Sequence, residues 1–454
     1  MKSHLPEKIY LASPVWVQNF LVSIYGYLEH GRRYGGAHKK LLDELYENEF
    51  KTQEEIKKIA DAKLEYIINV SVNHVPYYQK LGLKKPNLQS FPVLDRQTVA
   101  DNTESFVNQR YPKSSLLPLF TGGSSGNPLK VYITKGIRQK SYAFWSKFYK
   151  RMDFEIGDRK ASFVGRKLQD PDNDTPPFWR YNFKDRQLIF SSYHMSDKNL
   201  PLYLEKLNEF KPKVIEGYPL SIYRLAEFII QNSINIDFKP TGISTSSENF
   251  TNSQRKVIEQ AFDSKVYDQY GSAESVVFAA ECEFGTMHIE PEYGVVEVLT
   301  KEGTVKPEGS GELLVTTLLN DAMPLIRYRI GDLGEVGYAP CQCGRETPVL
   351  KQLDGKVGAV IVSENKSVPT AAIAIAFEYL EGVKHAQIIQ NEPDQVIVKL
   401  VKKSDFVKES EDFMIWELRK MLGNKLKISV EYVDEIPPSP NGKYKMVVQN
   451  YSKH

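Results

Sequence analysis

Cysteine is scarce in this sequence, and neither sign of charge dominates it. Three cysteines among 454 residues are too few for a disulfide-stapled secreted protein, so we expect a reducing compartment, the cytoplasm. The 59 Lys and Arg residues nearly balance the 57 Asp and Glu residues, which leaves a formal net charge of +2. So small a charge creates no overall field for nucleic acid or an anionic membrane, and substrates must be recognised locally.

Long hydrophobic runs are also nearly absent, with one exception at the N-terminus. Residues Ile9–Leu28 are rich in apolar side chains, but Pro14, Gln18 and Asn19 interrupt them. The run is too broken to span a bilayer, and no small-residue cleavage site of a signal peptide follows it. We interpret it as a packed N-terminal helix, with a membrane-surface element as the alternative.

The rest of the chain has the composition of a globular protein, and its length favours two or three domains. Apolar residues at helical spacing predict helix over residues 37–82. From about residue 114 to about residue 336, short β-rich runs alternate with helical or loop segments, which predicts an α/β architecture. The β-rich runs are Leu116–Phe120, Ser162–Val164, Val214–Ile215, Val266–Tyr267, Val295–Leu299 and Gly311–Thr317.

Beyond residue 340 the pattern predicts a separate, smaller α+β unit. We place the boundary near Leu353–Lys356, which gives a large N-terminal domain (residues 1–355) and a small C-terminal domain (residues 356–454). In the small domain we expect helices at residues 370–380 and 408–422, and strands at residues 385–390, 395–401 and 427–433.

The most informative stretch is a loop rich in glycine and serine that follows an apolar strand. It reads Thr121-Gly122-Gly123-Ser124-Ser125-Gly126-Asn127-Pro128-Leu129-Lys130. Glycines let backbone N–H groups approach an anion, hydroxyls add donors, and the lysine supplies a charge suited to phosphate. It is not a Walker A loop, because no Gly-Lys-Ser/Thr follows, and in isolation such a loop is usually a flexible turn.

Four further motifs follow in a fixed order. They are Ser246-Ser247-Glu248, Tyr267-Asp268-Gln269-Tyr270-Gly271-Ser272-Ala273-Glu274, Arg327-Tyr328-Arg329-Ile330-Gly331-Asp332 and Pro440-Asn441-Gly442-Lys443. Together with the phosphate loop, this set resembles the adenylate-forming acyl-CoA synthetase superfamily, and within it the phenylacetate–CoA ligase and CapK-like branch. The resemblance covers nearly the whole chain, and five ordered motifs are far more specific than any one of them.

The resemblance implies an α/β fold with a large adenylate-forming domain and a small, mobile α+β C-terminal domain. It also implies ATP-dependent activation of a small carboxylic acid to acyl-AMP, followed by transfer to CoA. Glu274 would be a catalytic residue as the Mg²⁺ ligand, Asp332 would bind the ribose hydroxyls, Tyr270 would stack on adenine, and Lys443 would be the mobile catalytic lysine. The implied ATP-binding set is Thr121, Gly122, Ser124, Ser125, Gly126, Lys130, Ser247, Glu248, Asp268, Gln269, Tyr270, Gly271, Ser272 and Asp332.

The chain departs from the family pattern at the hinge between the two domains. The family carries Gly-Arg followed by paired acidic residues, whereas this chain has Gly355-Lys356-Val357-Gly358-Ala359. Loss of the acidic pair puts the usual swivel between half-reactions in doubt. Gly358 still permits large backbone rotations.

All three cysteines lie beside the active-site motifs. Cys341 and Cys343 flank one residue in a turn, and Cys282 precedes His288 by six residues. Together they form a plausible Cys₃His set for a structural Zn²⁺, and the CapK-like branch resembles this arrangement. The alternative is three buried free thiols and a surface histidine.

The acid pocket is expected between the phosphate loop and the adenine loop, as in the family. The candidate lining residues are Tyr142, Trp145, Tyr193, His194 and Tyr218, although each alone is more often core packing. Two other functions stay open: transfer of the acyl group to an amine or hydroxyl, such as an amino sugar, and a catalytically silent nucleotide-binding scaffold. The sequence is compatible with a homodimer.

Overall fold

The structure is a computed structural model. It describes residues 5–120, 129–170, 172–248, 251–356, 360–363, 366–369, 373, 377, 380, 382–437 and 445–450. Among these residues, none of the helices combines the length and the apolar character that crossing a bilayer requires.

Helices form the first quarter of the chain, as the apolar spacing predicts. The predicted helix over residues 37–82 is divided into three, because the chain turns after Asn48 and Pro76 restricts the residue before it. Thr52 and Glu55 form a reciprocal capping box that starts the second of these helices. The helices here are α1 (Leu5–Ala12), α2 (Val15–Arg33), α3 (Gly36–Asn48), α4 (Gln53–His74), α5 (Pro76–Gln79) and α6 (Arg96–Asp101).

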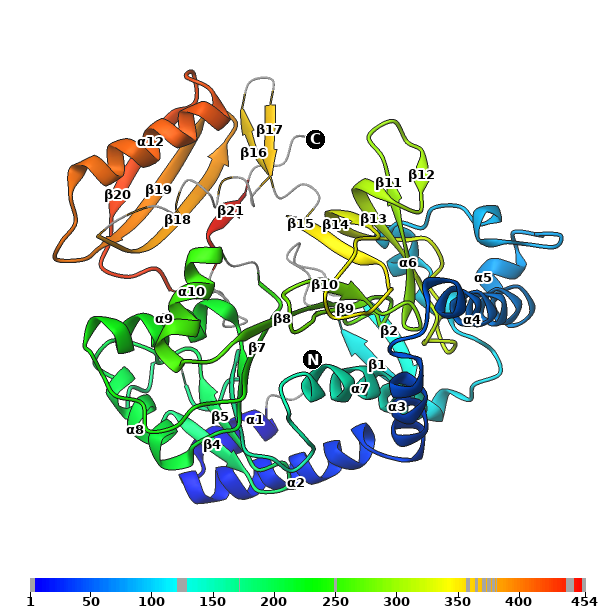
Figure 1. Cartoon of the computed structure of the whole chain (residues 1–454), viewed down its shortest axis with the longest axis horizontal. Coiled ribbons are helices and arrows are strands. Elements are labelled where there is room, and N and C mark those ends of the chain that lie inside the picture. The colour runs from blue at the N-terminus through cyan, green and yellow to red at the C-terminus, as the bar shows by residue number, and fades with distance from the viewer. Residues whose placement is uncertain are drawn as a thin grey trace.

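A sheet of thirteen strands is the centre of the large N-terminal part (Figure 1). Its order is β12-β11-β13-β14-β15-β10-β9-β8-β7-β6-β3-β5-β4. The strands are β3 (Lys160–Val164), β4 (Trp179–Asn182), β5 (Gln187–Ser191), β6 (Val214–Gly217), β7 (Gly242–Ser246), β8 (Val266–Gly271), β9 (Phe278–Glu281), β10 (Met287–Ile289), β11 (Gly294–Leu299), β12 (Val305–Lys306), β13 (Gly309–Thr317), β14 (Tyr328–Gly337) and β15 (Val349–Lys356). The six predicted β-rich runs are confirmed, five of them here and the sixth in β1 (Leu116–Phe120).

Strands β5, β3, β6, β7 and β8 run parallel, and the strands on either side of them are antiparallel. Parallel strands need crossover connections, which helices provide here. The crossover helices are α8 (Leu200–Phe210), α9 (Pro219–Gln231) and α10 (Asn252–Phe262), and α7 (Lys135–Lys150) precedes β3. This confirms the predicted α/β class.

The C-terminal part has its own four-stranded sheet in the order β20-β19-β18-β21. Helix α12 packs on it through Met414, Leu418 and Leu422, which share a buried cluster with strand residues. The predicted helix at residues 408–422 and all three predicted strands are confirmed, while most of residues 370–380 lies outside the described residues. The elements are β16 (Val360–Ser363), β17 (Lys366–Pro369), β18 (Val383–Glu392), β19 (Gln395–Lys402), α12 (Lys408–Leu422), β20 (Lys427–Tyr432) and β21 (Val447–Gln449).

Ion pairs join the two parts next to α9 (Figure 1). Lys403 Nζ donates to Glu227 Oε1 at 2.7 Å, and Lys384 pairs with Asp197. A cavity at the same junction is lined from both parts, by residues that include Tyr223 and His385. Burial lowers the pKa of His385 to about 3, with Arg224 and Lys384 acting in the same direction, so this ring is neutral at physiological pH.

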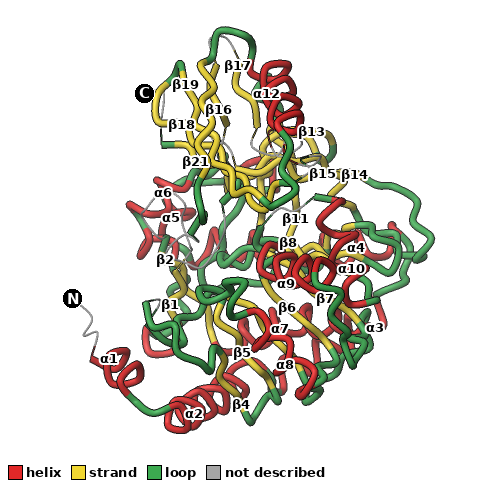
Figure 2. The backbone as a smooth tube through the Cα atoms, turned by 90° about the vertical axis from the view of Figure 1, so that its left-hand side faces the viewer, coloured by secondary structure: helices red, strands yellow, loops and turns green. Residues whose placement is uncertain are grey.

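Helix α2 covers β4, the edge strand of the large sheet, and the helix expected over Ile9–Leu28 is present but divided at Pro14 into α1 and α2. The contact of α2 with the strand is polar. Tyr181 N–H donates to Asn19 Oδ1 at 2.9 Å, and Phe183 N–H donates to Ser23 Oγ at 3.1 Å. The side chains of α2 therefore pair with backbone groups at the edge of the sheet, and Figure 2 shows α1 and α2 at the outer border of the molecule.

Candidate functional site

The strands on both sides of the predicted phosphate loop form an antiparallel pair. Strand β1 is joined to β2 (Lys130–Thr134), and Phe120 lies opposite Lys130 in the register. Residues 121–128, which include Thr121, Gly122, Ser124, Ser125 and Gly126, lie outside the described residues. Lys130 Nζ lies 3.6 Å from Glu104 and 4.4 Å from the centroid of the Tyr132 ring.

Two of the predicted nucleotide motifs meet through a hydrogen bond. The Tyr270 hydroxyl, at the end of β8, donates to Asp332 Oδ2, on β14, at 2.8 Å. Burial raises the pKa of Tyr270 well above its usual value, and the charge of Asp332 raises it further. The hydroxyl therefore keeps its proton and remains a donor. Residues 62 positions apart are thus held in one place.

Glu274 lies beside this pair, on the turn after β8. Its Oε1 is 3.6 Å from Arg96 Nη1 and accepts a long hydrogen bond of 3.5 Å from the Tyr328 hydroxyl. Glu274 is almost fully buried, and burial together with Glu274 raises the pKa of Tyr328. A buried carboxylate with hard oxygen atoms is a suitable ligand for Mg²⁺, so the residues present fit this ion.

Sequence reasoning missed Arg96, the first residue of α6. Its only signal is a single basic residue in a segment without a motif. It is brought to the site because Leu94 and Tyr328 form a bridge between the preceding loop and β14.

Asp268 and Gln269 lie just before Tyr270 on β8, toward the interior of the sheet. Burial and the neighbouring Glu281 raise the pKa of Asp268 to about 7, and the Thr245 hydroxyl donates to its Oδ1 at 2.8 Å. Gln269 is buried, and a Cβ at Gly271 would lie 2.6 Å from Gln269 Nε2, so a side chain at position 271 would need the space that Gln269 fills.

The loops around this strand add two serines. Ser272 Oγ is buried and has no hydrogen-bond partner among the described residues, which suits a group that binds a ligand. Ser247 has a φ of 74°, a left-handed conformation that is rare for serine. Burial raises the pKa of the Tyr218 phenol, and the charge of Glu248, next to Ser247, raises it further.

The predicted acid-pocket residues fall into three places. Tyr193 and Tyr218 meet at the backbone of Gly165, where the Tyr193 hydroxyl donates to the carbonyl at 3.4 Å. Tyr142 and Trp145 lie one turn apart on α7. The Tyr142 ring lies 5.9 Å from that of Tyr34, and Trp145 packs edge-on against Phe278 at 5.3 Å.

His194 is buried in the protein interior. Its Nδ1 is 2.7 Å from Ser191 Oγ, its Nε2 is 3.1 Å from the Asp170 carbonyl oxygen, and its ring stacks on Phe178. Both ring nitrogens are thus engaged within the protein, which is the environment of a histidine that orders the loop after β5.

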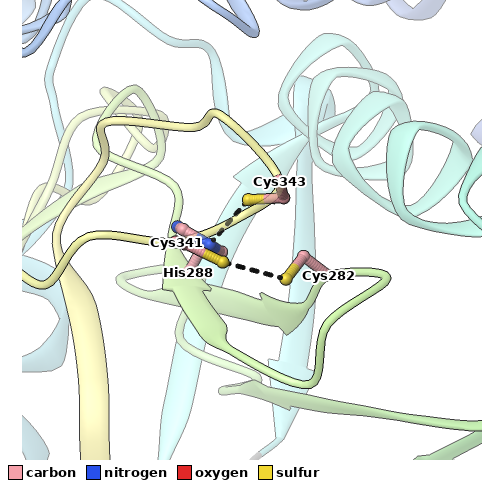
Figure 3. Close-up of side chains that lie close together, drawn as sticks. All are labelled: Cys282, His288, Cys341 and Cys343. Carbon is pink, nitrogen blue, oxygen red and sulfur yellow. Dashed lines mark hydrogen bonds between the residues drawn. The ribbon is translucent and has the colours of Figure 1, made fainter.

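The three cysteines and His288 converge on one point (Figure 3). Their ligand atoms all lie within 4.8 Å of one another. Cys282 Sγ is 3.6 Å from Cys341 Sγ, and Cys343 Sγ is 3.2 Å from His288 Nε2. The β9–β10 hairpin supplies one cysteine and the histidine, and the loop between β14 and β15 supplies the other two cysteines.

The surroundings of this cluster suit the binding of a metal ion. His288 Nδ1 is 3.0 Å from Thr347 Oγ1, which leaves Nε2 directed at the thiols. Burial, Arg151 and Arg345 lower the pKa of His288 to about 4, so the imidazole is neutral as a ligand must be. Three sulfurs and one nitrogen at this spacing fit Zn²⁺ in a closed, structural site.

Lys443, Gly358 and Ala359 lie outside the described residues. Their predicted roles stay predictions.

Sequence comparisons place these features among known proteins. Residues 360–450 match the family model of the CapK C-terminal domain. The chain is 28% identical to Protein CapK of Staphylococcus aureus over 456 residues, which cover 97% of this chain and 99% of that protein. It is 26% identical to the phenylacetate-coenzyme A ligase of Thermus thermophilus, covering 52% of this chain and 58% of that protein. It is 25% identical to the indoleacetate–lysine synthetase of Pseudomonas savastanoi, covering 53% of this chain and 58% of that protein.

Among solved structures, a 2-hydroxyisobutyryl-CoA ligase in the postadenylation state has a TM-score of 0.68 at 17% identity, covering 88% of this chain and 91% of that chain. The same ligase in the thioesterfication state has a TM-score of 0.54 at 18% identity, covering the same shares. The fold is therefore shared over most of both chains. The full-length similarity to Protein CapK and the match of the C-terminal model support placing the chain in the adenylate-forming superfamily, in the phenylacetate–CoA ligase and CapK-like branch.

Proposed function

We propose that this protein activates a carboxylic acid as an acyl-AMP, with release of pyrophosphate, and then transfers the acyl group to CoA. The observation that carries the proposal is the meeting of Tyr270 with Asp332 and Glu274, which come from two motifs far apart in the sequence. A catalytically silent scaffold is disfavoured, because the chain retains Glu274, Asp332 and Lys443, to which the resemblance assigns Mg²⁺ binding, ribose binding and catalysis.

Each of these groups has a role in the proposed first half-reaction. Asp332 accepts hydrogen bonds from the ribose hydroxyls, and the Tyr270 hydroxyl fixes the orientation of its carboxylate. Glu274 would hold Mg²⁺, which would offset the repulsion between the triphosphate and the incoming acid. Arg96, next to Glu274, is placed to contact the same anionic groups.

The second half-reaction requires the C-terminal domain, proposed to span residues 356–454, to turn on the N-terminal domain of residues 1–355. The higher TM-score against the postadenylation state than against the thioesterfication state supports an arrangement near that of the first half-reaction. Turning would break the Lys403–Glu227 and Lys384–Asp197 ion pairs. Gly358 is the proposed pivot.

A second candidate is transfer of the acyl group to an amine or hydroxyl in place of CoA. Similarity to an indoleacetate–lysine synthetase, whose name states an amine acceptor, supports it. The first half-reaction and its residues would be the same.

Pyrophosphate exchange with a panel of carboxylic acids, followed by discharge of the acyl-AMP to CoA or to amines, tests both candidates. The Glu274→Gln variant should reduce exchange by about 10²–10³-fold with the best acid. Glu335→Gln, an exposed change on β14, is the matched control and should leave exchange unchanged. No exchange with any acid would refute the proposal, and discharge to amines alone would select the second candidate.

A further inference from the structure

Helix α2 has its polar and apolar faces reversed relative to an ordinary surface helix. Its polar side chains face the protein: besides Asn19 and Ser23, the Gln18 amide donates to the carbonyl oxygens of Tyr10 at 2.9 Å and Ser13 at 3.0 Å. A surface helix normally buries its apolar stripe and exposes its polar one. The apolar stripe of α2 therefore has to be explained by something outside the described chain.

The outward face carries large aromatic and aliphatic side chains. Trp16 is 73% exposed, Phe20 60% and Tyr27 68%. Residues 9–28 include no Asp, Glu, Lys or Arg. Phe183, in the turn after β4, is also exposed, and the next residue, Lys184, reaches the Tyr27 ring, so this turn borders the same face. The other exposed members of this face, called the α2 face below, are Ile9, Leu21, Ile24, Tyr25 and Leu28.

The charge at the border of the α2 face is positive. Arg32 at the end of α2 and Lys184 in the turn after β4 are exposed, and Lys184 Nζ lies 6.0 Å from the Tyr27 ring centroid. The two described carboxylates there are already paired: Glu29 is buried against Arg138, and Asp185 contacts His30 Nδ1 at 2.8 Å. Arg32 also pairs with Glu29, at 2.9 Å, so the single Glu29 carboxylate is shared by Arg32, Arg33 and Arg138, and the border keeps a net positive charge.

We propose that the α2 face binds an anionic lipid surface, with the helix lying in the plane of the interface. Trp and Tyr prefer the boundary between headgroups and acyl chains, and a cationic border complements anionic headgroups. Figure 2 shows α1 and α2 at the outer border of the molecule, where a flat surface can reach them. A second copy of the chain fits less well, because a symmetric contact would bring the two cationic borders together.

The test measures binding of the full-length protein to vesicles. Co-sedimentation is compared for phosphatidylcholine vesicles and for vesicles that also contain phosphatidylglycerol. Wild type should bind the anionic vesicles preferentially, and binding should weaken as salt increases. Trp16→Ser with Phe20→Ser should weaken binding about tenfold or more, because two exposed aromatic side chains are removed. The matched control, Phe413→Ser with Trp416→Ser on the exposed side of α12, should bind like wild type.

Two further measurements make the result decisive. Brominated lipids should quench tryptophan fluorescence of wild type, and Trp16→Phe should lose that quenching while it still binds. Unchanged circular dichroism and thermal unfolding of the double variant would show that it is folded. Absence of binding to anionic vesicles would overturn the proposal. So would sedimentation velocity showing a dimer that the Trp16→Ser, Phe20→Ser variant converts to a monomer, because the second copy would then be the occupant.

Discussion

Among single residues, Lys443 carries the most specific chemical prediction. Its ammonium is proposed to bridge the carboxylate and the α-phosphate as charge develops during adenylation. Lys443→Ala should reduce pyrophosphate exchange by about 10²–10³-fold and leave ATP binding nearly intact, because one preorganised charge contributes at the transition state. Lys445→Ala removes the same charge two residues later and serves as the control. Exchange within a few-fold of wild type in Lys443→Ala would refute the assignment.

Asp268 should make stability depend on pH. Burial and Glu281 raise its pKa to about 7, so the folded protein holds this proton more tightly than the unfolded chain does. The resulting stabilisation is fully present below about pH 4 and is lost as the pH rises through about 7. The free energy of unfolding should fall by about 2–4 kcal/mol over this range.

Asp268→Asn should therefore flatten this part of the pH profile. Urea unfolding at pH 5 and pH 8 measures it, as the difference between wild type and variant. Asp263→Asn, an exposed aspartate at the end of α10, is the control and should follow wild type. An equal loss of stability with pH in Asp268→Asn and wild type would show that another group is responsible.

Residue-level prediction from sequence succeeded where a motif and a spacing coincide. The four proposed zinc ligands were grouped from their residue types, their spacing and the family resemblance, and the structure brings their ligand atoms within 4.8 Å of one another. Arg96 could not be named, because its proximity to Glu274 depends on how a loop crosses β14. The internal bonding of His194 was equally invisible, since both partners come from the folded surroundings.

At the scale of elements, the proposed zinc ion would tie the β9–β10 hairpin to the loop between β14 and β15. We expect one Zn²⁺ per chain, measurable by elemental analysis. Cys343→Ser or chelation should lower the thermal unfolding temperature more than it changes exchange activity, because a structural metal contributes folding free energy.

Thr347→Val is the graded variant for this site. It removes the hydroxyl that orients His288 and should weaken zinc binding by about 10–100-fold without abolishing it. Purified wild type without zinc would contradict the site, as would a Cys343→Ser variant with unchanged zinc content.

Element boundaries followed the sequence closely where local signals are strong. The helix at residues 408–422 and the strand Leu116–Phe120 were predicted to the residue. The helical character expected over residues 37–82 is confirmed, but the break after Asn48 was not predicted, because apolar spacing does not reveal the capping box that starts the next helix. The orientation of α2 was also beyond periodicity alone, because its polar side chains bond to a strand some 160 residues away.

At the scale of the whole molecule, the ion pairs between the two parts should bias the arrangement seen here. Lys403→Met leaves the buried Glu227 without this partner and should shift the population away from this arrangement. Acyl-AMP formation should slow by about two- to fivefold relative to its discharge, since a partly buried pair contributes on the order of 1 kcal/mol.

Single-turnover measurement of both half-reactions checks this expectation. Lys420→Met is the control, because Lys420 pairs with Glu417 within α12 and does not reach the large N-terminal part. Equal slowing of both half-reactions in Lys403→Met would argue against a role for this ion pair in the domain arrangement.

Global properties of the sequence, such as its composition and net charge, predicted the class of protein better than the local charge on the protein surface. A net charge of +2 indicates no strong overall field, and it averages over the cationic border of the α2 face. How the C-terminal part sits on α9 was also unpredictable, because it depends on side chains from both parts meeting after each has folded.

The polar contact between α2 and β4 also bears on solubility. An exposed edge strand is a template on which further chains can add strands, and the side chains of α2 block this by bonding to the backbone of β4. A chain that lacks residues 1–33 should therefore form aggregates rich in β-structure, detectable by light scattering and thioflavin fluorescence. Asn19→Ala with Ser23→Ala should do so more slowly, while Trp16→Ser with Phe20→Ser should not. The same helix would then keep copies of the protein apart, whatever surface its outer face meets.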